Sequence, residues 1–187
     1  MEKKIYYWEG KIKKNILPID LQQLIFAGNF CQKIKKDVLP NNLQQLTFGI
    51  GSAFNQKIKK NVLPKNLQQL TFGFHFNQKI KKDVLPNNLQ QLTFGDNFNQ
   101  KIKKDVLPNN LQQLTFGDNF DQKIKTDNLP KNLSEIIFIS ENYNNIDYKL
   151  HVPLKWLYIN NNIIYSKYNK DRKSTRLNSS HITISYA

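Results

Sequence analysis

The sequence has little cysteine, histidine or glycine, and it contains no long apolar run. Among its 187 residues are one cysteine, Cys31, three histidines and seven glycines. A single thiol excludes an intramolecular disulfide framework. No apolar stretch approaches the roughly 20 residues of a membrane-spanning helix, and residues 1–8 lack a signal-peptide core. We therefore expect no transmembrane segment and a cytoplasmic location.

Residues suited to catalysis or metal binding are also scarce. His75, His151 and His181 are not paired with cysteine or carboxylates at metal-ligand spacing. One aspartate per unit follows a lysine-rich segment, where it is expected to offset lysine charge rather than form an acid/base pair. These aspartates are Asp37, Asp83, Asp105 and Asp127. We expect a protein that is not an enzyme and uses no cofactor or metal.

The sequence does contain a repeated unit, clearest at residues 98–119. Its copies are marked by prolines: Pro18, Pro40, Pro64, Pro86, Pro108 and Pro130. The steps between them are 22, 24, 22, 22 and 22 residues, the longer step reflecting two residues inserted within 49–53. A strict period of this length is typical of a solenoid.

Each unit carries apolar residues at fixed offsets. Leu92-Thr93-Phe94 alternates inward, outward, inward, as in a short strand. Pro86 and Pro108 fix φ and have no N–H, so the return arm is expected to be extended or turned and not helical. The predicted fold is a repeat solenoid of about seven coils. Each coil of about 22 residues would add one short parallel β-strand, with little or no α-helix.

The unit resembles two known repeat patterns. Leu89-x-x-Leu92-x-Phe94-x-x-Asn97 is similar to the leucine-rich repeat. The fuller string, Phe98-Asn99-Gln100-x-Ile102 followed by Leu107-Pro108-x-x-Leu111-x-x-Leu114-Thr115-Phe116, resembles the FNIP repeat of amoebal and giant-virus proteins. The resemblance runs from about Trp8 to Ile164. It implies a leucine-rich-repeat-like solenoid with a protein-interaction role and no established activity, in the host cytoplasm if the protein is viral.

The chain divides into four segments. Residues 1–17 form a partial N-terminal repeat in which Trp8 is aligned with Phe98, and residues 18–132 form the FNIP-like repeats. Residues 133–170 are degenerate repeats with a further strand expected within 154–164. Residues 171–187 abandon the period and are expected to be non-native or disordered. No capping helix is evident, so self-association through uncovered coil ends is also expected.

The outward residues of the strands form the first candidate binding surface. Aligned rows of glutamine and threonine would give a polar, uncharged strip that changes character toward the C-terminus. The candidate partner-binding residues are Gln91, Thr93, Gln113, Thr115, Glu135, Trp156 and Tyr158. Two alternatives stay open: the rows could hydrogen-bond to one another between coils, and Trp156 and Tyr158 could cover the last coil rather than anchor a partner.

The lysine-rich arm is the second candidate surface. The formal net charge is +14, and seventeen of the 28 basic residues lie in the Lys-Ile-Lys-Lys segments. The candidate polyanion-binding residues are Lys79, Lys81, Lys82, Lys101, Lys103 and Lys104. A solvated charged face is the alternative. The preferred function is thus a non-catalytic protein–protein interaction module, with electrostatic binding of nucleic acid or an anionic membrane as the second hypothesis.

Overall fold

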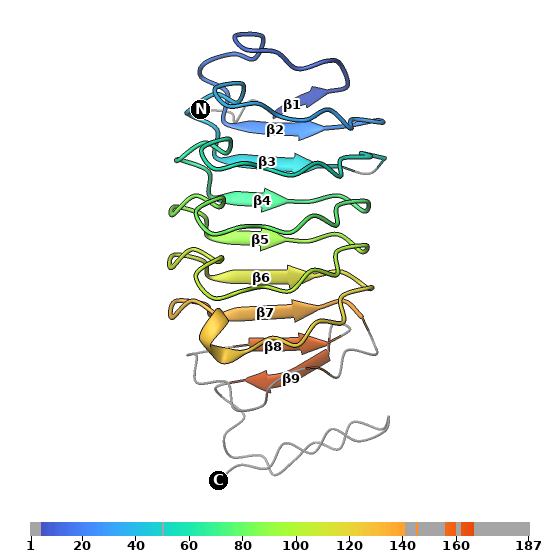
Figure 1. Cartoon of the computed structure of the whole chain (residues 1–187), viewed down its shortest axis with the longest axis vertical. Coiled ribbons are helices and arrows are strands. Elements are labelled where there is room, and N and C mark those ends of the chain that lie inside the picture. Colours follow the sequence, from blue (N-terminus) through green and yellow to red (C-terminus); the bar gives the residue numbers. More distant parts are fainter. Residues whose placement is uncertain (1–4, 50, 141–144, 146–155, 160–161, 167–187) are drawn as a thin grey trace.

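The protein is a stack of coils in which each coil adds one strand to a continuous sheet (Figure 1). The computed structural model describes residues 5–49, 51–140, 145, 156–159 and 162–166, the last two ranges through their backbone alone. Its strands are β1 (Ile5–Trp8), β2 (Gln23–Phe26), β3 (Gln45–Phe48), β4 (Gln69–Thr71), β5 (Gln91–Thr93), β6 (Gln113–Phe116), β7 (Glu135–Phe138), β8 (Trp156–Ile159) and β9 (Asn162–Ser166).

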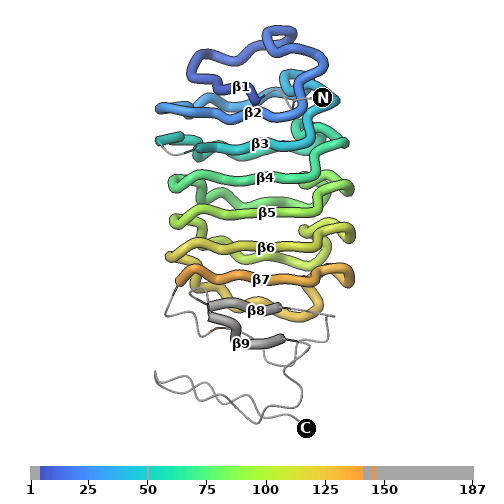
Figure 2. The backbone as a smooth tube through the Cα atoms, turned by 180° about the vertical axis from the view of Figure 1, so that it is seen from behind, coloured from blue at the N-terminus to red at the C-terminus, as the bar shows by residue number. Residues whose placement is uncertain are grey.

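The strands follow one another across the sheet in sequence order. Neighbours from β1 to β8 are parallel, and β9 runs antiparallel to β8. The register joins equivalent residues, so that Leu92 pairs with Leu114 and Thr93 with Thr115. Seen from behind, the return arms of successive coils also follow one another along the stack (Figure 2). Each sequence offset therefore becomes a row of equivalent side chains, most of them identical in the central coils.

The core between strand and arm contains rows of leucine, isoleucine and valine and two columns of phenylalanine. Leu92 and Phe94 are each 1% exposed, which confirms the predicted inward positions. Within one coil the ring centroids of Phe94 and Phe98 lie 3.7 Å apart. Between coils the centroids of Phe94 and Phe116 lie 5.6 Å apart, and those of Phe98 and Phe120 lie 6.1 Å apart. Since no coil can bury these rings alone, stacking is what removes them from water.

Two tight turns shape each return arm. The first places an asparagine or aspartate at positive φ, a conformation these residues tolerate better than most; these residues are Asn15, Asp37, Asn61, Asp83 and Asp105. In the second, a proline carbonyl accepts a hydrogen bond from the N–H three residues later, as Pro86 does from Leu89 at 3.1 Å. Within the described residues the one helical segment is the 3₁₀ turn η1 (Thr126–Asn128). The predicted solenoid with little or no α-helix is confirmed.

The first coil differs from the sequence-based alignment. Trp8 lies in register with Phe26, so it occupies the strand position of Phe94 and not the arm position of Phe98. The alignment of Trp8 with Phe98 is therefore wrong. It arose because Trp8 precedes the buried Ile12 by four residues, as Phe98 precedes Ile102, whereas Phe26 precedes Ile34 by eight. The first coil simply lacks four residues between strand and arm.

The C-terminal end has one expected and one unexpected strand. β8 falls within 154–164, where a further strand was expected, but the antiparallel strand β9 has no precursor in the repeat pattern. The tail of residues 171–187, expected to be non-native or disordered, lies outside the described residues.

The two inserted residues lie between Phe48 and Phe54 and leave the core intact. The ring centroids of these phenylalanines remain 4.1 Å apart. Ser52 is buried, and its Oγ donates a hydrogen bond to the carbonyl oxygen of Phe30 at 3.2 Å. Gly51 adopts φ of 84° in this segment. The longer step is therefore absorbed in the loop that follows the strand.

Candidate binding surfaces

The strand face presents two straight rows of outward side chains. Gln91 pairs in register with Gln113, and Gln113 with Glu135. The second row joins Thr93, Thr115 and Ile137 in the same way. These side chains are half-buried or exposed between the fully buried leucine and phenylalanine positions. The topology thus brings the first five candidate partner-binding residues onto one continuous face.

The other two candidates continue these rows along the backbone. Trp156 is in register with Glu135, and Tyr158 with Ile137. The structure describes β8 by its backbone only, so the two side-chain roles predicted for Trp156 and Tyr158 lie outside what it describes.

The strand-face rows make little use of their own hydrogen-bonding groups. On this face, within the described residues, Gln113 donates from Nε2 to a Glu135 carboxylate oxygen. The side chains of Gln91, Thr93 and Thr115 form no hydrogen bond with any described residue. The self-bonded ladder that the sequence left open is therefore confined to one pair, and the remaining amide and hydroxyl groups face outward.

A self-bonded amide ladder exists at a different offset, which the sequence reasoning did not single out. The Oδ1 atom of Asn77 accepts a hydrogen bond from the N–H of Asn99 at 3.0 Å and from Nε2 of Gln100 at 2.8 Å. Asn55 bonds to the coil after it in the same way, and so does Asn99. The sequence does carry a signal for this ladder, because the string Phe-Asn-Gln recurs in successive units. The Oδ1 atoms of these asparagines link neighbouring coils by hydrogen bonds, so they are not available to a binding partner.

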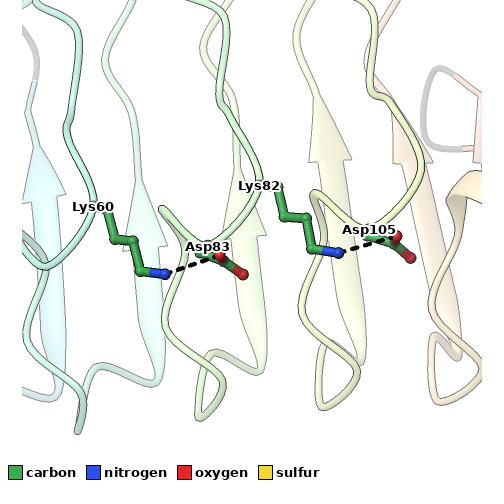
Figure 3. Close-up of polar contacts among 4 residues, drawn as sticks. All are labelled: Lys60, Lys82, Asp83 and Asp105. Carbon is green, nitrogen blue, oxygen red and sulfur yellow. Dashed lines mark hydrogen bonds and ion pairs between the residues drawn. The ribbon is translucent and has the colours of Figure 1, made fainter.

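The six candidate polyanion-binding lysines are all exposed along the arm. Figure 3 shows how this surface is connected: Nζ of Lys60 lies 3.0 Å from Oδ2 of Asp83, and Nζ of Lys82 lies 3.4 Å from Oδ2 of Asp105. Each pair joins one coil to the next. For these two aspartates the expected role of offsetting lysine charge is observed, and the positive φ of both adds a conformational role that the sequence reasoning missed.

The carboxyl of Asp83 responds electrostatically to this arrangement. The hydrogen bond from Lys60 and the positive charge of Lys60 lower its pKa below the ordinary value, with a further contribution from Lys82. We expect Lys60→Met to raise the pKa of Asp83 toward that value, as measured by NMR titration of its carboxyl carbon.

The lowered pKa of Asp83 determines how the stability of the fold changes with pH. The pair stabilises the fold above the pKa that Asp83 has in the unfolded chain, and this contribution disappears as the pH falls through the folded-state pKa. Because both side chains are exposed, added salt should weaken it. An Asp83 titration unchanged by Lys60→Met would mean that the ion pair does not persist in solution.

The described residues contain no cluster of side chains suited to metal binding. No three histidine, cysteine, aspartate or glutamate side chains there are grouped so that they could hold a metal ion. His75 packs edge-on against the ring of Phe74, with centroids 5.0 Å apart. In the same part of the chain no helix is long and apolar enough to cross a membrane.

Coil length, parallel register and aligned leucine rows together define the class: a leucine-rich-repeat-like solenoid. The chain belongs to the FNIP repeat family, whose model matches residues 9–51, 54–97 and 98–141. Among solved structures it is similar to CroV588, a giant-virus protein described as a novel circular LRR protein. The two share 41% identity with a TM-score of 0.63 over 81% of this chain. That overlap is 26% of the CroV588 chain, and a search of curated proteins finds no match.

Proposed function

We propose that the chain is a cytoplasmic, non-catalytic interaction module that binds a protein partner through its strand face. The observation that supports this proposal is the set of outward amide and hydroxyl groups on β5 and β6 that no described residue satisfies. A parallel sheet held by two phenylalanine columns fixes the backbone that carries these groups. A surface ordered before binding loses less side-chain entropy on association.

The C-terminal part of this face has the variation that recognition of one partner requires. The glutamine row ends in Glu135 and the threonine row in Ile137. Trp156 and Tyr158 follow in register, and residues of these two types are enriched among the anchors of protein interfaces. We therefore propose that the partner-binding surface extends from β5 to β8.

Substitutions on this face should abolish capture of a protein partner. With the full chain immobilised, we expect Thr93→Arg with Thr115→Arg to reduce capture of a discrete protein by about tenfold or more, because two large cations would be forced into the interface. The matched control is Lys101→Ala with Lys103→Ala on the arm, which should capture as the wild type does. Loss in the control and retention in the strand-face variant would contradict the proposal.

The lysine arm supports a second candidate, the binding of a polyanion. Lys79, Lys81, Lys101, Lys103 and Lys104 are exposed and form no ion pair with a described carboxylate. Each coil repeats these lysine positions, so a flexible anionic chain could contact several lysines at once. Such binding would depend on counterion release rather than on shape.

Salt dependence measures this second candidate directly. For oligothymidylate, the slope of log K against log salt should become about 1.4 units less steep in Lys101→Ala with Lys103→Ala, since each lost phosphate contact removes about 0.7. Gln91→Ala on the strand face should leave the slope unchanged. A slope that is the same in all three proteins would exclude the arm as the polyanion site.

A further inference from the structure

A groove lined only by polar side chains runs along the stack beside the starts of the strands. It encloses about 950 Å³, and twelve residues from successive coils line it. Four successive coils each contribute the asparagine two residues after the proline and the first glutamine of Leu-Gln-Gln, as in Asn66 with Gln68 and Asn88 with Gln90. This glutamine row adjoins but differs from the strand-face row of Gln69 and Gln91.

The backbone holds the groove in place. Leu67 and Leu89, between the asparagine and the glutamine of each pair, are 0% exposed and point into the core. The carbonyl oxygen of Gln68 accepts hydrogen bonds from the N–H groups of Gln90 and Gln91 at 2.8 and 3.0 Å. The two amide rows are therefore fixed on either side of a row of buried leucines.

The amide groups of this groove are largely unused. The side chains of Gln68, Gln90 and Asn88 form no hydrogen bond with any described residue. Asn66 uses one N–H, donated to the carbonyl oxygen of Asn41 at 3.0 Å. Each free amide offers two donors and one accepting oxygen. The groove thus repeats the same donor and acceptor set once per coil.

From this we infer that the groove binds a neutral, β-linked polysaccharide chain laid along the stack, with about one sugar per coil. A site that repeats without variation suits a ligand that also repeats. Sugar hydroxyls both donate and accept hydrogen bonds, which matches amides. An extended β-1,4-linked chain advances by close to one strand spacing per ring, and because successive rings are turned over, equivalent hydroxyls recur at every second coil. This site is separate from the strand face and does not depend on the proposed protein partner.

Two other polymers fit less well. An extended peptide repeats its backbone groups every two residues, about 6.6–6.8 Å, against the roughly 4.7–4.9 Å between neighbouring strands. Nucleic acid needs cations near its phosphates, whereas Lys131, at one end, is the sole charged residue among those lining the groove. A hydroxyl-rich, uncharged chain is the ligand that the lining favours.

The number of coils engaged should determine the affinity. The groove has no aromatic lining residue on which a sugar ring could stack, so each coil is expected to bind one sugar weakly. Contacts repeated along one chain add without a new association cost for each. Long oligosaccharides should therefore bind far better than short ones.

The test is calorimetric titration of the full chain with chitohexaose and with cellohexaose, each compared with its disaccharide. At least one hexamer should bind about tenfold or more tightly than its dimer. Gln68→Ala with Gln90→Ala should weaken hexamer binding by about tenfold, while the adjacent pair Gln69→Ala with Gln91→Ala should leave it unchanged. Comparing chitohexaose with cellohexaose shows whether the groove prefers a polymer of acetamido sugars or one of glucose.

Three results would overturn the inference. The first is that neither hexamer binds the wild-type chain. The second is equal weakening by the two double variants, which would place the sugar elsewhere; urea midpoints equal to that of the wild type would show that both variants are folded. The third is binding of polyadenylate, but of no glycan, with loss in Gln68→Ala plus Gln90→Ala, which would assign the groove to nucleic acid.

Discussion

Replacing Phe94 by alanine should lower the free energy of unfolding by about 3–5 kcal/mol. The ring is 1% exposed and stacks on Phe98 with centroids 3.7 Å apart. It also lies 5.6 Å from both Phe72 and Phe116 in the neighbouring coils. Its removal would interrupt one phenylalanine column and leave a cavity that rigid neighbouring strands cannot close. Urea unfolding followed by circular dichroism would measure the loss.

Phe74→Ala is the matched control for this prediction. Phe74 lies on the rim after β4 and is 51% exposed, so its removal should change stability by no more than about 0.5 kcal/mol. Equal effects of the two substitutions would show that the phenylalanine columns do not form the core.

Replacing Gly95 by alanine should also destabilise the stack, by about 1–3 kcal/mol. A Cβ atom built at Gly95 would lie 2.4 Å from the carbonyl oxygen of Gly73 in the preceding coil and 2.5 Å from its carbonyl carbon. Because both contacts are to backbone, two coils would have to separate locally. The same urea titration would detect the lower midpoint.

Gly10→Ala is the matched control, because a Cβ atom fits at this position without a close contact. The nearest atoms to a Cβ at Gly10 belong to the side chain of Trp8, at 3.6 Å and beyond. Its stability should stay within about 0.5 kcal/mol of the wild type. If Gly95→Ala changed stability as little as Gly10→Ala, the coils carrying Gly73 and Gly95 would not approach each other as closely as the structure shows.

Periodicity made the fold predictable. A 22-residue step and the alternation of Leu92, Thr93 and Phe94 were enough to assign a parallel sheet with one strand per coil, and the register confirms this assignment. The outward rows followed from the same alternation, since residues that alternate along a strand lie on opposite faces. Exposure of the lysine arm followed from the absence of apolar residues between its inward positions.

The features that could not be predicted from the sequence depend on contacts between coils or lie where the repeat is irregular. The sequence cannot show that Asn77 turns its amide toward the N–H of Asn99 instead of toward water. It suggests a lysine partner for Asp105 but not the positive φ, because several conformations place a carboxylate near a lysine. The shortened first coil misled the alignment of Trp8, since local spacing to Ile12 imitated a different part of the unit.

The amide groove was not predicted from the sequence for a geometric reason. Gln68 and Gln69 are adjacent in sequence and chemically identical, yet the bend at the start of the strand places them in different rows. Only the hydrogen bonds that Gln90 and Gln91 both donate to the carbonyl of Gln68 reveal that bend.

Capture of partners by the full chain at low and high salt, with and without nuclease, tests the central functional claim most directly. The account predicts a discrete protein that remains bound at high salt after nuclease treatment, and that is lost with Thr93→Arg plus Thr115→Arg. Recovery of nucleic acid alone, released as salt rises, would contradict the strand-face proposal and assign binding to the lysine arm.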